Sequence, residues 1–194
     1  MSISATDTRS SSEHWLQSYY FIRAAVSICW VIAAFSLGQN PAIAAALLLI
    51  YPAWDAAANY LDASRSGGLA KNPTQAINLA ASVLATIAVL VTQQIGGGAM
   101  VLGVFGIWAL ASGLLQLGTA IRRWKTSGAQ WVMILSGAQS ALAGVFFFVQ
   151  ALSPAAAPAI SIIPGYAALG AVYFLISAVW LTVKSYRAKP KLAV

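Results

Sequence analysis

The chain contains six long apolar runs, and its charged residues lie almost entirely between them. The runs cover about residues 19–38, 41–61, 76–93, 99–121, 131–151 and 164–183. Each is close to the ~20 residues that a helix needs to cross about 30 Å of hydrocarbon. Only 8% of the 194 residues are charged, whereas a soluble domain carries about 25%. We therefore expect an all-α, polytopic membrane protein with six transmembrane helices.

The basic residues predict how these helices are oriented. One, two, three and four Lys or Arg residues lie respectively before residue 15, in 62–75, in 122–130 and after residue 183. The alternate turns, near 39–40, 94–98 and 152–163, contain no charged residue. Because Lys and Arg accumulate on the cytoplasmic side of a membrane, we expect both termini in the cytoplasm. The predicted regions are a disordered cytoplasmic tail (1–14), a transmembrane domain (15–183) and a basic cytoplasmic tail (184–194).

Local signals predict some of the helix ends. Ser10 and Glu13 fit a capping box, which places the start of the first helix near Ser11. In the first turn, Gly38 is expected to end a helix in the left-handed conformation, and Asn40 to cap the next helix at Pro41. The start of the sixth helix stays open, because the segment 152–163 is itself apolar.

The six runs also suggest an internal repeat of three helical hairpins, beginning near residues 19, 75 and 131. Residues 108–113 in the fourth run are similar to residues 173–178 in the sixth. Each hairpin enters and leaves on one side, which predicts parallel repeats. Small residues at helical spacing, including Ser136, Ser140 and Gly144 in the fifth run, indicate close packing between helices.

These segments resemble the HdeD-like acid-resistance membrane proteins, whose short repeat is a domain of unknown function. The resemblance rests on residues 107–117 (IWALASGLLQL), the basic turn 122–125 (RRWK), and residues 135–137 and 142–148 of the next helix. It covers about residues 19–183 and departs most in the first hairpin, at Pro52 and Asp55. The resemblance implies a bacterial inner membrane, six helices and a link to acid or general stress, but no catalytic residues.

Arg23 and Asp55 are ionisable residues inside apolar runs, where a charge is costly and often functional. Arg23 lies about 6 Å and Asp55 about 10 Å from the same membrane surface, at about 1.5 Å per residue. We therefore predict that they pair across the first hairpin, with Asn59 and Tyr20 as supporting polar groups. The pair either fixes helix register or forms a proton- or ion-responsive site. Alternatively, Arg23 extends to the lipid headgroups while Asp55 faces a hydrated cavity.

Gln116 and Gln139 are further polar residues within the apolar runs. They are expected either to form interhelical hydrogen bonds or to line a polar lumen. Because no run shows a dense polar stripe, we do not favour a water-filled channel. Pro52 is expected to kink the second helix just before Asp55.

The chain lacks the motifs of the common enzyme classes. His14 is the only histidine and Cys29 the only cysteine, which argues against a catalytic triad, a disulfide and a metal site of known spacing. Residues 96–98 (GGG) lack the Lys and Ser or Thr of a phosphate-binding loop. We therefore expect neither an enzyme nor a cofactor. The basic residues do not gather on one face as in a nucleic-acid binder.

These observations predict a non-enzymatic inner-membrane protein associated with acid or general stress. Its partners are the lipid bilayer and either another membrane protein or further copies of itself. The alternative is a small transporter or proton-responsive permeation protein centred on Asp55 and Arg23.

Overall fold

The computed structural model describes residues 5–153, 155 and 157–188, with side chains only within residues 14–187. The helices are α1 (Ala5–Leu37), α2 (Pro41–Arg65), the one-turn η1 (Leu69–Lys71), α3 (Pro73–Ile95), α4 (Gly98–Arg123), α5 (Gln130–Ala151) and α6 (Ala159–Ala188). Six of them are long and apolar enough to cross a membrane. The described residues form no strand. The predicted all-α fold with six membrane-spanning helices is confirmed.

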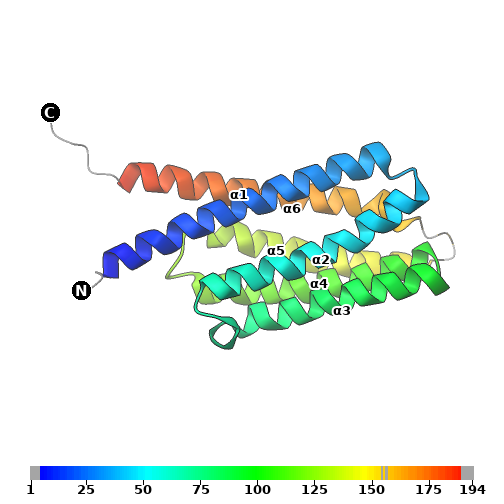
Figure 1. Cartoon of the computed structure of the whole chain (residues 1–194), viewed down its shortest axis with the longest axis horizontal. Helices are drawn as coiled ribbons and strands as arrows, with labels where there is room; N and C mark the ends of the chain where they lie inside the picture. The colour runs from blue at the N-terminus through cyan, green and yellow to red at the C-terminus, as the bar shows by residue number, and fades with distance from the viewer. Residues whose placement is uncertain (1–4, 154, 156, 189–194) are drawn as a thin grey trace.

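The six long helices form a closed ring. Each packs against the next helix in the sequence, and α6 returns to lie along α1 (Figure 1). The most extensive contacts are those of α4 with α5, α1 with α6, and α2 with α3. The two helices within each predicted hairpin contact one another less than they contact the neighbouring hairpins. The hairpins are therefore not separate packing units, and their repetition stays a prediction.

The two ends of the ring differ in charge. At the charged end, the connections 66–72 and 124–129 contain Lys71 and Lys125, and α1 begins and α6 ends there (Figure 1). At the uncharged end, the connections 38–40 and 96–97 carry no ionisable side chain. This asymmetry is the one on which the predicted orientation rests.

Some helix ends differ from the prediction. α1 begins at Ala5, within the segment predicted as a disordered tail and before Ser11. Residues 5–18 contain no Gly or Pro, and a long helix extends at little cost once its first turn has formed. α6 begins at Ala159 and contains Pro164. The predicted basic tail is helical to Ala188, and residues 1–4 and 189–194 lie outside the described residues.

The first turn confirms one predicted cap and corrects another. The Asn40 side-chain oxygen accepts hydrogen bonds from the backbone N–H groups of Ala42 (3.0 Å) and Ile43 (3.3 Å). Gly38 does not have a positive φ, so the predicted left-handed conformation is wrong. Glycine is needed there because a Cβ atom would collide with the carbonyl oxygen of Ala34 and come within 3.0 Å of Ile160.

Close packing of α4 on α5 depends on glycines that face one another. A Cβ atom on Gly113 would lie 2.5 Å from the backbone nitrogen of Ala141 and 2.6 Å from the carbonyl oxygen of Gly137. Gly144 approaches the α4 backbone in the same way, at Gly106 and Leu110. Without side chains between them, the two backbones gain dispersion contacts over much of their length.

The interior of the ring is apolar toward the uncharged end. The apolar plug is the cluster of fully or nearly fully buried side chains Trp30, Leu48, Val89, Leu102, Phe105, Phe147 and Ile163. Each of the six long helices contributes at least one of these residues. A second apolar cluster, which includes Leu16, Tyr20, Met133 and Leu181, joins α1, α5 and α6 nearer the charged end. The plug closes one half of the ring and leaves the polar residues in the other half.

Candidate functional site

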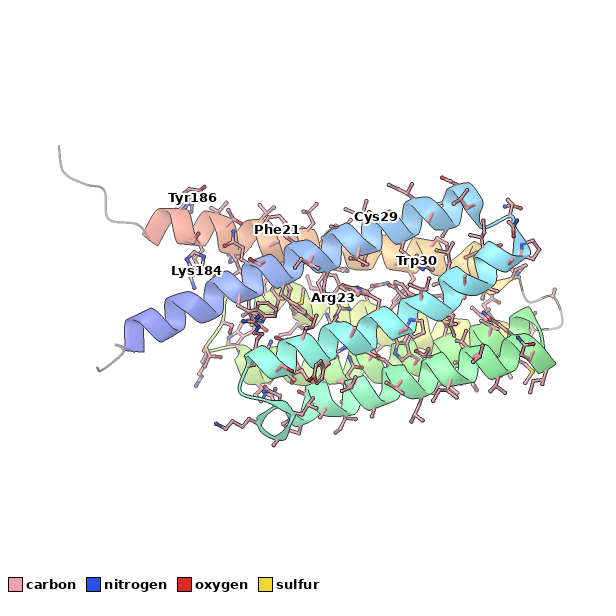
Figure 2. All side chains as sticks on the ribbon, viewed as in Figure 1. Phe21, Arg23, Cys29, Trp30, Lys184 and Tyr186 are labelled. Atoms are coloured by element: carbon pink, nitrogen blue, oxygen red, sulfur yellow. The ribbon has the colours of Figure 1, made fainter. Side chains whose placement is uncertain are left out.

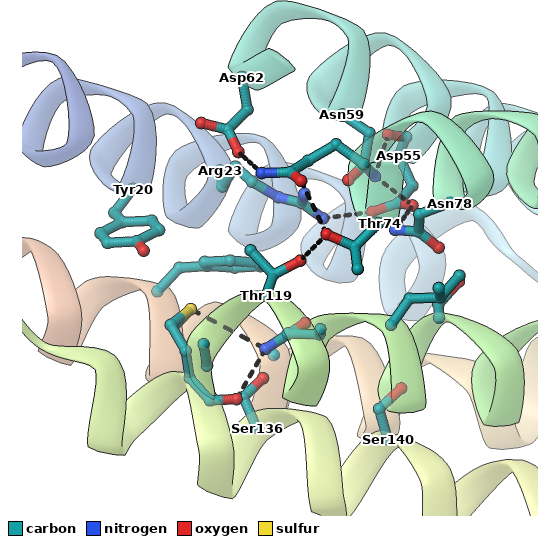
Figure 3. A pocket seen from close by; sticks show the side chains of 18 of the residues that line it. Tyr20, Arg23, Asp55, Asn59, Asp62, Thr74, Asn78, Thr119, Ser136 and Ser140 are labelled. Atoms are coloured by element: carbon teal, nitrogen blue, oxygen red, sulfur yellow. Dashed lines mark hydrogen bonds and ion pairs between the residues drawn. The ribbon is translucent and has the colours of Figure 1, made fainter. Parts of the chain in front are cut away.

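A polar cavity lies inside the ring. Its volume is about 100 Å³ and side chains from all six helices line it (Figure 3). The charged lining residues are Arg23, Asp55, Asp62 and Arg123. Most of the others are hydroxyl, amide or aromatic side chains. Because the plug covers the uncharged end, the cavity does not continue through the bundle.

Two helices present polar stripes to this cavity. On α4 the stripe is Trp108, Ser112, Gln116, Thr119 and Arg123, and on α2 it is Tyr51, Asp55, Asn59 and Asp62. The spacings of three and four residues keep each set on one helix face. The expectation that no run carries a dense polar stripe is therefore wrong. The stripes were missed because Ser, Thr, Tyr and Trp do not interrupt an apolar run as charges do.

The predicted pairing of Arg23 with Asp55 is present. Arg23 Nη2 lies 2.5 Å from Asp55 Oδ1, which ties α1 to α2. Arg23 Nη1 donates to the Tyr19 hydroxyl (3.1 Å), and the guanidinium lies over the Phe174 ring, 4.4 Å from its centroid. Arg23 therefore turns toward the interior of the ring, as Figures 2 and 3 show, instead of extending to the headgroups.

The second oxygen of Asp55 accepts hydrogen bonds from three more side chains. These are Asn59 Nδ2 (2.9 Å), Ser82 Oγ (2.8 Å) and Asn78 Nδ2 (3.4 Å). Ser82 Oγ in turn accepts from the Trp108 indole (2.9 Å). An ionised carboxylate only accepts hydrogen bonds, so an all-donor environment matches charged Asp55. This residue is only 8% exposed.

The supporting residues proposed from the sequence divide into two groups. Asn59 contacts Asp55 directly, as predicted. Tyr20 lines the cavity and stacks on Phe174 with the ring centroids 6.1 Å apart, but its neighbour Tyr19 makes the hydrogen bond to Arg23. The two tyrosines are adjacent in the sequence, which contains no signal for which of them turns toward Arg23.

A second charged network lines the cavity at the charged end. Arg123 Nη1 lies 3.0 Å from Asp62 Oδ2, and Gln75 Nε2 donates to the same oxygen (3.1 Å). Arg122 Nη2 donates to Gln75 Oε1 (2.7 Å). The prediction treated Arg122 and Arg123 only as topology charges. Asp62 follows Asp55 by seven residues, which puts both carboxylates on one helix face and is the signal that could have found this network.

Gln116 and Gln139 both line the cavity. Gln116 Nε2 donates to the carbonyl oxygen of Met133 (3.2 Å), an interhelical hydrogen bond between α4 and α5. Gln139 forms no hydrogen bond with any other described residue. Gln116 therefore has the predicted role of an interhelical hydrogen bond, and Gln139 has the other predicted role, that of a side chain lining a polar space.

The cavity wall contains hydrogen-bonding capacity that the described part of the chain does not fill. Arg23 Nε, Trp54 Nε1, Asn78 Oδ1 and Ser112 Oγ are buried without a partner there, and all four residues line the cavity. A buried polar atom without a partner costs about 1–3 kcal/mol. Such groups therefore favour a polar occupant of the cavity.

Other chemistry-bearing residues lie away from the cavity. Cys29 is exposed on the outer surface of α1 (Figure 2), and His14 is exposed near the charged end. Within the described ranges, no three His, Cys, Asp or Glu side chains come together as metal ligands. The cavity is thus the main concentration of polar groups that the helices enclose.

Comparison with protein-family models, curated proteins and solved structures finds no match to this chain. The resemblance to the HdeD-like proteins therefore stays a prediction based on the quoted residues.

Proposed function

We propose that the protein binds a small polar solute in the cavity and allows it to cross the membrane. The single observation that carries this proposal is a polar cavity inside the bundle, lined by all six membrane helices, with unfilled hydrogen-bonding capacity in its wall. Polar groups inside a membrane bundle are costly and commonly mark a solute or ion path. The function is non-enzymatic, and it develops the transporter alternative centred on Asp55 and Arg23.

Arg23 and Asp55 hold the cavity open in this proposal. They pair with each other and with neighbouring side chains, so they fix the positions of α1, α2 and α3 around the polar space. The plug is the barrier on the uncharged side. A solute that enters from the charged end passes only if the aromatic and aliphatic side chains of the plug move apart.

We further propose that the charged end faces the cytoplasm of a bacterial inner membrane, with both termini there. The support is the excess of Lys and Arg at that end. A link to acid or general stress rests on the family resemblance alone. Reporter fusions at residues 39 and 127 test the orientation. A reporter that works only outside the cytoplasm should be active at residue 39 and inactive at residue 127, and a reporter that works only in the cytoplasm should give the opposite result.

Solute uptake into liposomes that contain the purified protein tests the function. The probes are small radiolabelled solutes, charged and uncharged, and protein-free liposomes provide the baseline. Ser112→Leu enlarges a cavity-lining side chain and should abolish any accelerated uptake. Leu142→Phe is the control, because Leu142 lies on the outer face of α5 and is 73% exposed. If no probe enters faster than in protein-free liposomes, the proposal is wrong.

A further inference from the structure

The charged groups of the cavity wall are already matched to one another. Arg23 pairs with Asp55 and Arg123 pairs with Asp62, so the two positive and two negative side chains balance. Asp55 accepts from Arg23 and from three neutral side chains, and Asp62 accepts from Arg123 and Gln75. An ion that entered would find no free counter-charge, and burying an uncompensated charge is costly.

Apart from Arg23 Nε, the groups that remain for a ligand are uncharged. Ser27, Tyr51, Ser136 and Gln139 line the cavity and form no side-chain hydrogen bond with another described residue. They come from α1, α2 and α5, so they surround the space on several sides. Figure 3 shows Ser136 on the side of the cavity opposite Asp55 and Asp62. Hydroxyl and primary amide groups both donate and accept hydrogen bonds.

The volume limits the size of the ligand. By the measure in which one water molecule needs about 10–15 Å³, a cavity of about 100 Å³ has room for several water molecules. Aromatic rings close part of the wall, including Trp108 and Phe174. The space therefore suits a compact molecule of a few non-hydrogen atoms.

We infer that the cavity selects small, uncharged molecules that carry both hydrogen-bond donors and acceptors, such as short amides and polyols, and rejects ions and zwitterions of the same size. This inference rests on the proposed function and adds the class of solute. It depends on the internal pairing of all four charges and on the free hydroxyl and amide groups beside them.

Two pairs of matched probes test this selectivity. Urea and guanidinium have nearly the same planar shape but differ in charge, and glycerol and glycine are of similar size but glycine is a zwitterion. Uptake of each radiolabelled probe is measured at pH 7 in liposomes with and without the protein. We expect faster uptake of urea, glycerol or both, and baseline uptake of guanidinium and glycine.

The result distinguishes failure of the inferred selectivity from failure of the proposed function. Accelerated uptake of guanidinium or glycine overturns the selectivity while leaving the proposed function in place. Baseline uptake of all four probes overturns both.

Substitutions then test which groups contact the solute. Gln139→Met keeps the side-chain length but removes the amide, and Ser136→Ala removes a hydroxyl. Each should slow uptake of the uncharged probe about two- to tenfold, the loss expected for one hydrogen bond. Thermal stability should change little, because neither polar group bonds to the described protein. Unchanged uptake in both variants would overturn the assignment of these groups to the ligand.

Matched controls separate contact with the solute from general damage to the fold. Gln93→Met removes an amide that bonds to the carbonyl oxygen of Ala45 (3.0 Å) outside the cavity. Ser177→Ala removes a buried hydroxyl that bonds within α6 to the carbonyl oxygen of Tyr173 (2.9 Å). Gln93→Met should lower thermal stability without slowing uptake, and Ser177→Ala should not slow uptake. If either control slows uptake as much as Gln139→Met, the assignment is wrong.

Discussion

Replacing Asp55 by Leu should be among the most destabilising substitutions at a single position in this chain. The change removes the acceptor of four side-chain hydrogen bonds and leaves the Arg23 guanidinium buried without a counter-charge. Breaking a buried ion pair in this way costs about 3–5 kcal/mol. For a protein of about 150–250 residues, 1 kcal/mol corresponds to about 2–4 °C in melting temperature. The expected decrease is therefore about 6–20 °C.

A double-mutant cycle separates this electrostatic effect from the loss of packing. Arg23→Met alone leaves Asp55 charged but still in contact with Asn59, Asn78 and Ser82, so it should be less harmful than Asp55→Leu. The double variant leaves neither charge and should be more stable than Asp55→Leu alone. The assay is thermal unfolding of the purified protein in detergent, followed by tryptophan fluorescence. If the double variant is no more stable than Asp55→Leu, the uncompensated Arg23 charge is not the cause.

Three further predictions address packing, the second ion pair and the plug. Gly113→Ala should lower the melting temperature because the new methyl group meets the α5 backbone at 2.5 Å, whereas Gly165→Ala, with open space around it, should not. Asp62→Asn should weaken the bond to Arg123 and cost about 1.5–3 kcal/mol, measured by thermal unfolding; an unchanged melting temperature would contradict this. Phe105→Ala should accelerate solute uptake, since Phe105 is 1% exposed at the centre of the plug; unchanged or slower uptake would show that the plug is not the barrier.

The six membrane-spanning helices could be predicted from the sequence because the length and polarity of each run are local properties. The bilayer requires about 20 apolar residues per span, and all six runs meet that requirement. The cap at Asn40 is equally local, since it needs only the next three residues. The need for glycine at position 38 is only partly local, because a Cβ atom there would meet Ala34 of the same helix and also Ile160 from α6.

The Arg23–Asp55 pair could be predicted because a single charge inside an apolar run is visible in the sequence and is costly unless it finds a partner. Arg23 and Asp55 each stand in an apolar run, and their similar depth restricts the choice of partner. Asp62 and Arg123 lie near helix ends, where a charge can be solvated without a partner. The sequence therefore gives no reason to expect an ion pair between them. The cavity was hidden for a related reason, since its wall consists mainly of residues that are also common in ordinary membrane helices.

Polar contacts bridge both boundaries of the ring at which the helices pack least extensively. Among neighbouring helices, α1 with α2 and α5 with α6 have the least extensive contacts. Arg23–Asp55 bridges the first boundary, together with the hydrogen bond from the Trp30 indole to the carbonyl oxygen of Leu47 (2.8 Å). The Ser140–Tyr166 hydrogen bond (2.7 Å) bridges the second.

This distribution gives a physical reason for burying a charged pair in the bundle. The α4–α5 boundary is held mainly by close backbone contact at glycines, with hydrogen bonds from Gln116 to Met133 and from Ser140 to Ala109 beside it. Polar side chains such as Arg23, Asp55, Ser140 and Tyr166 keep α1 and α6 in register with the other four helices while leaving space between them, and all four line the cavity. Apolar side chains large enough to hold the same boundaries would fill that space. The groups that stabilise the ring are therefore also those that keep its centre open and polar.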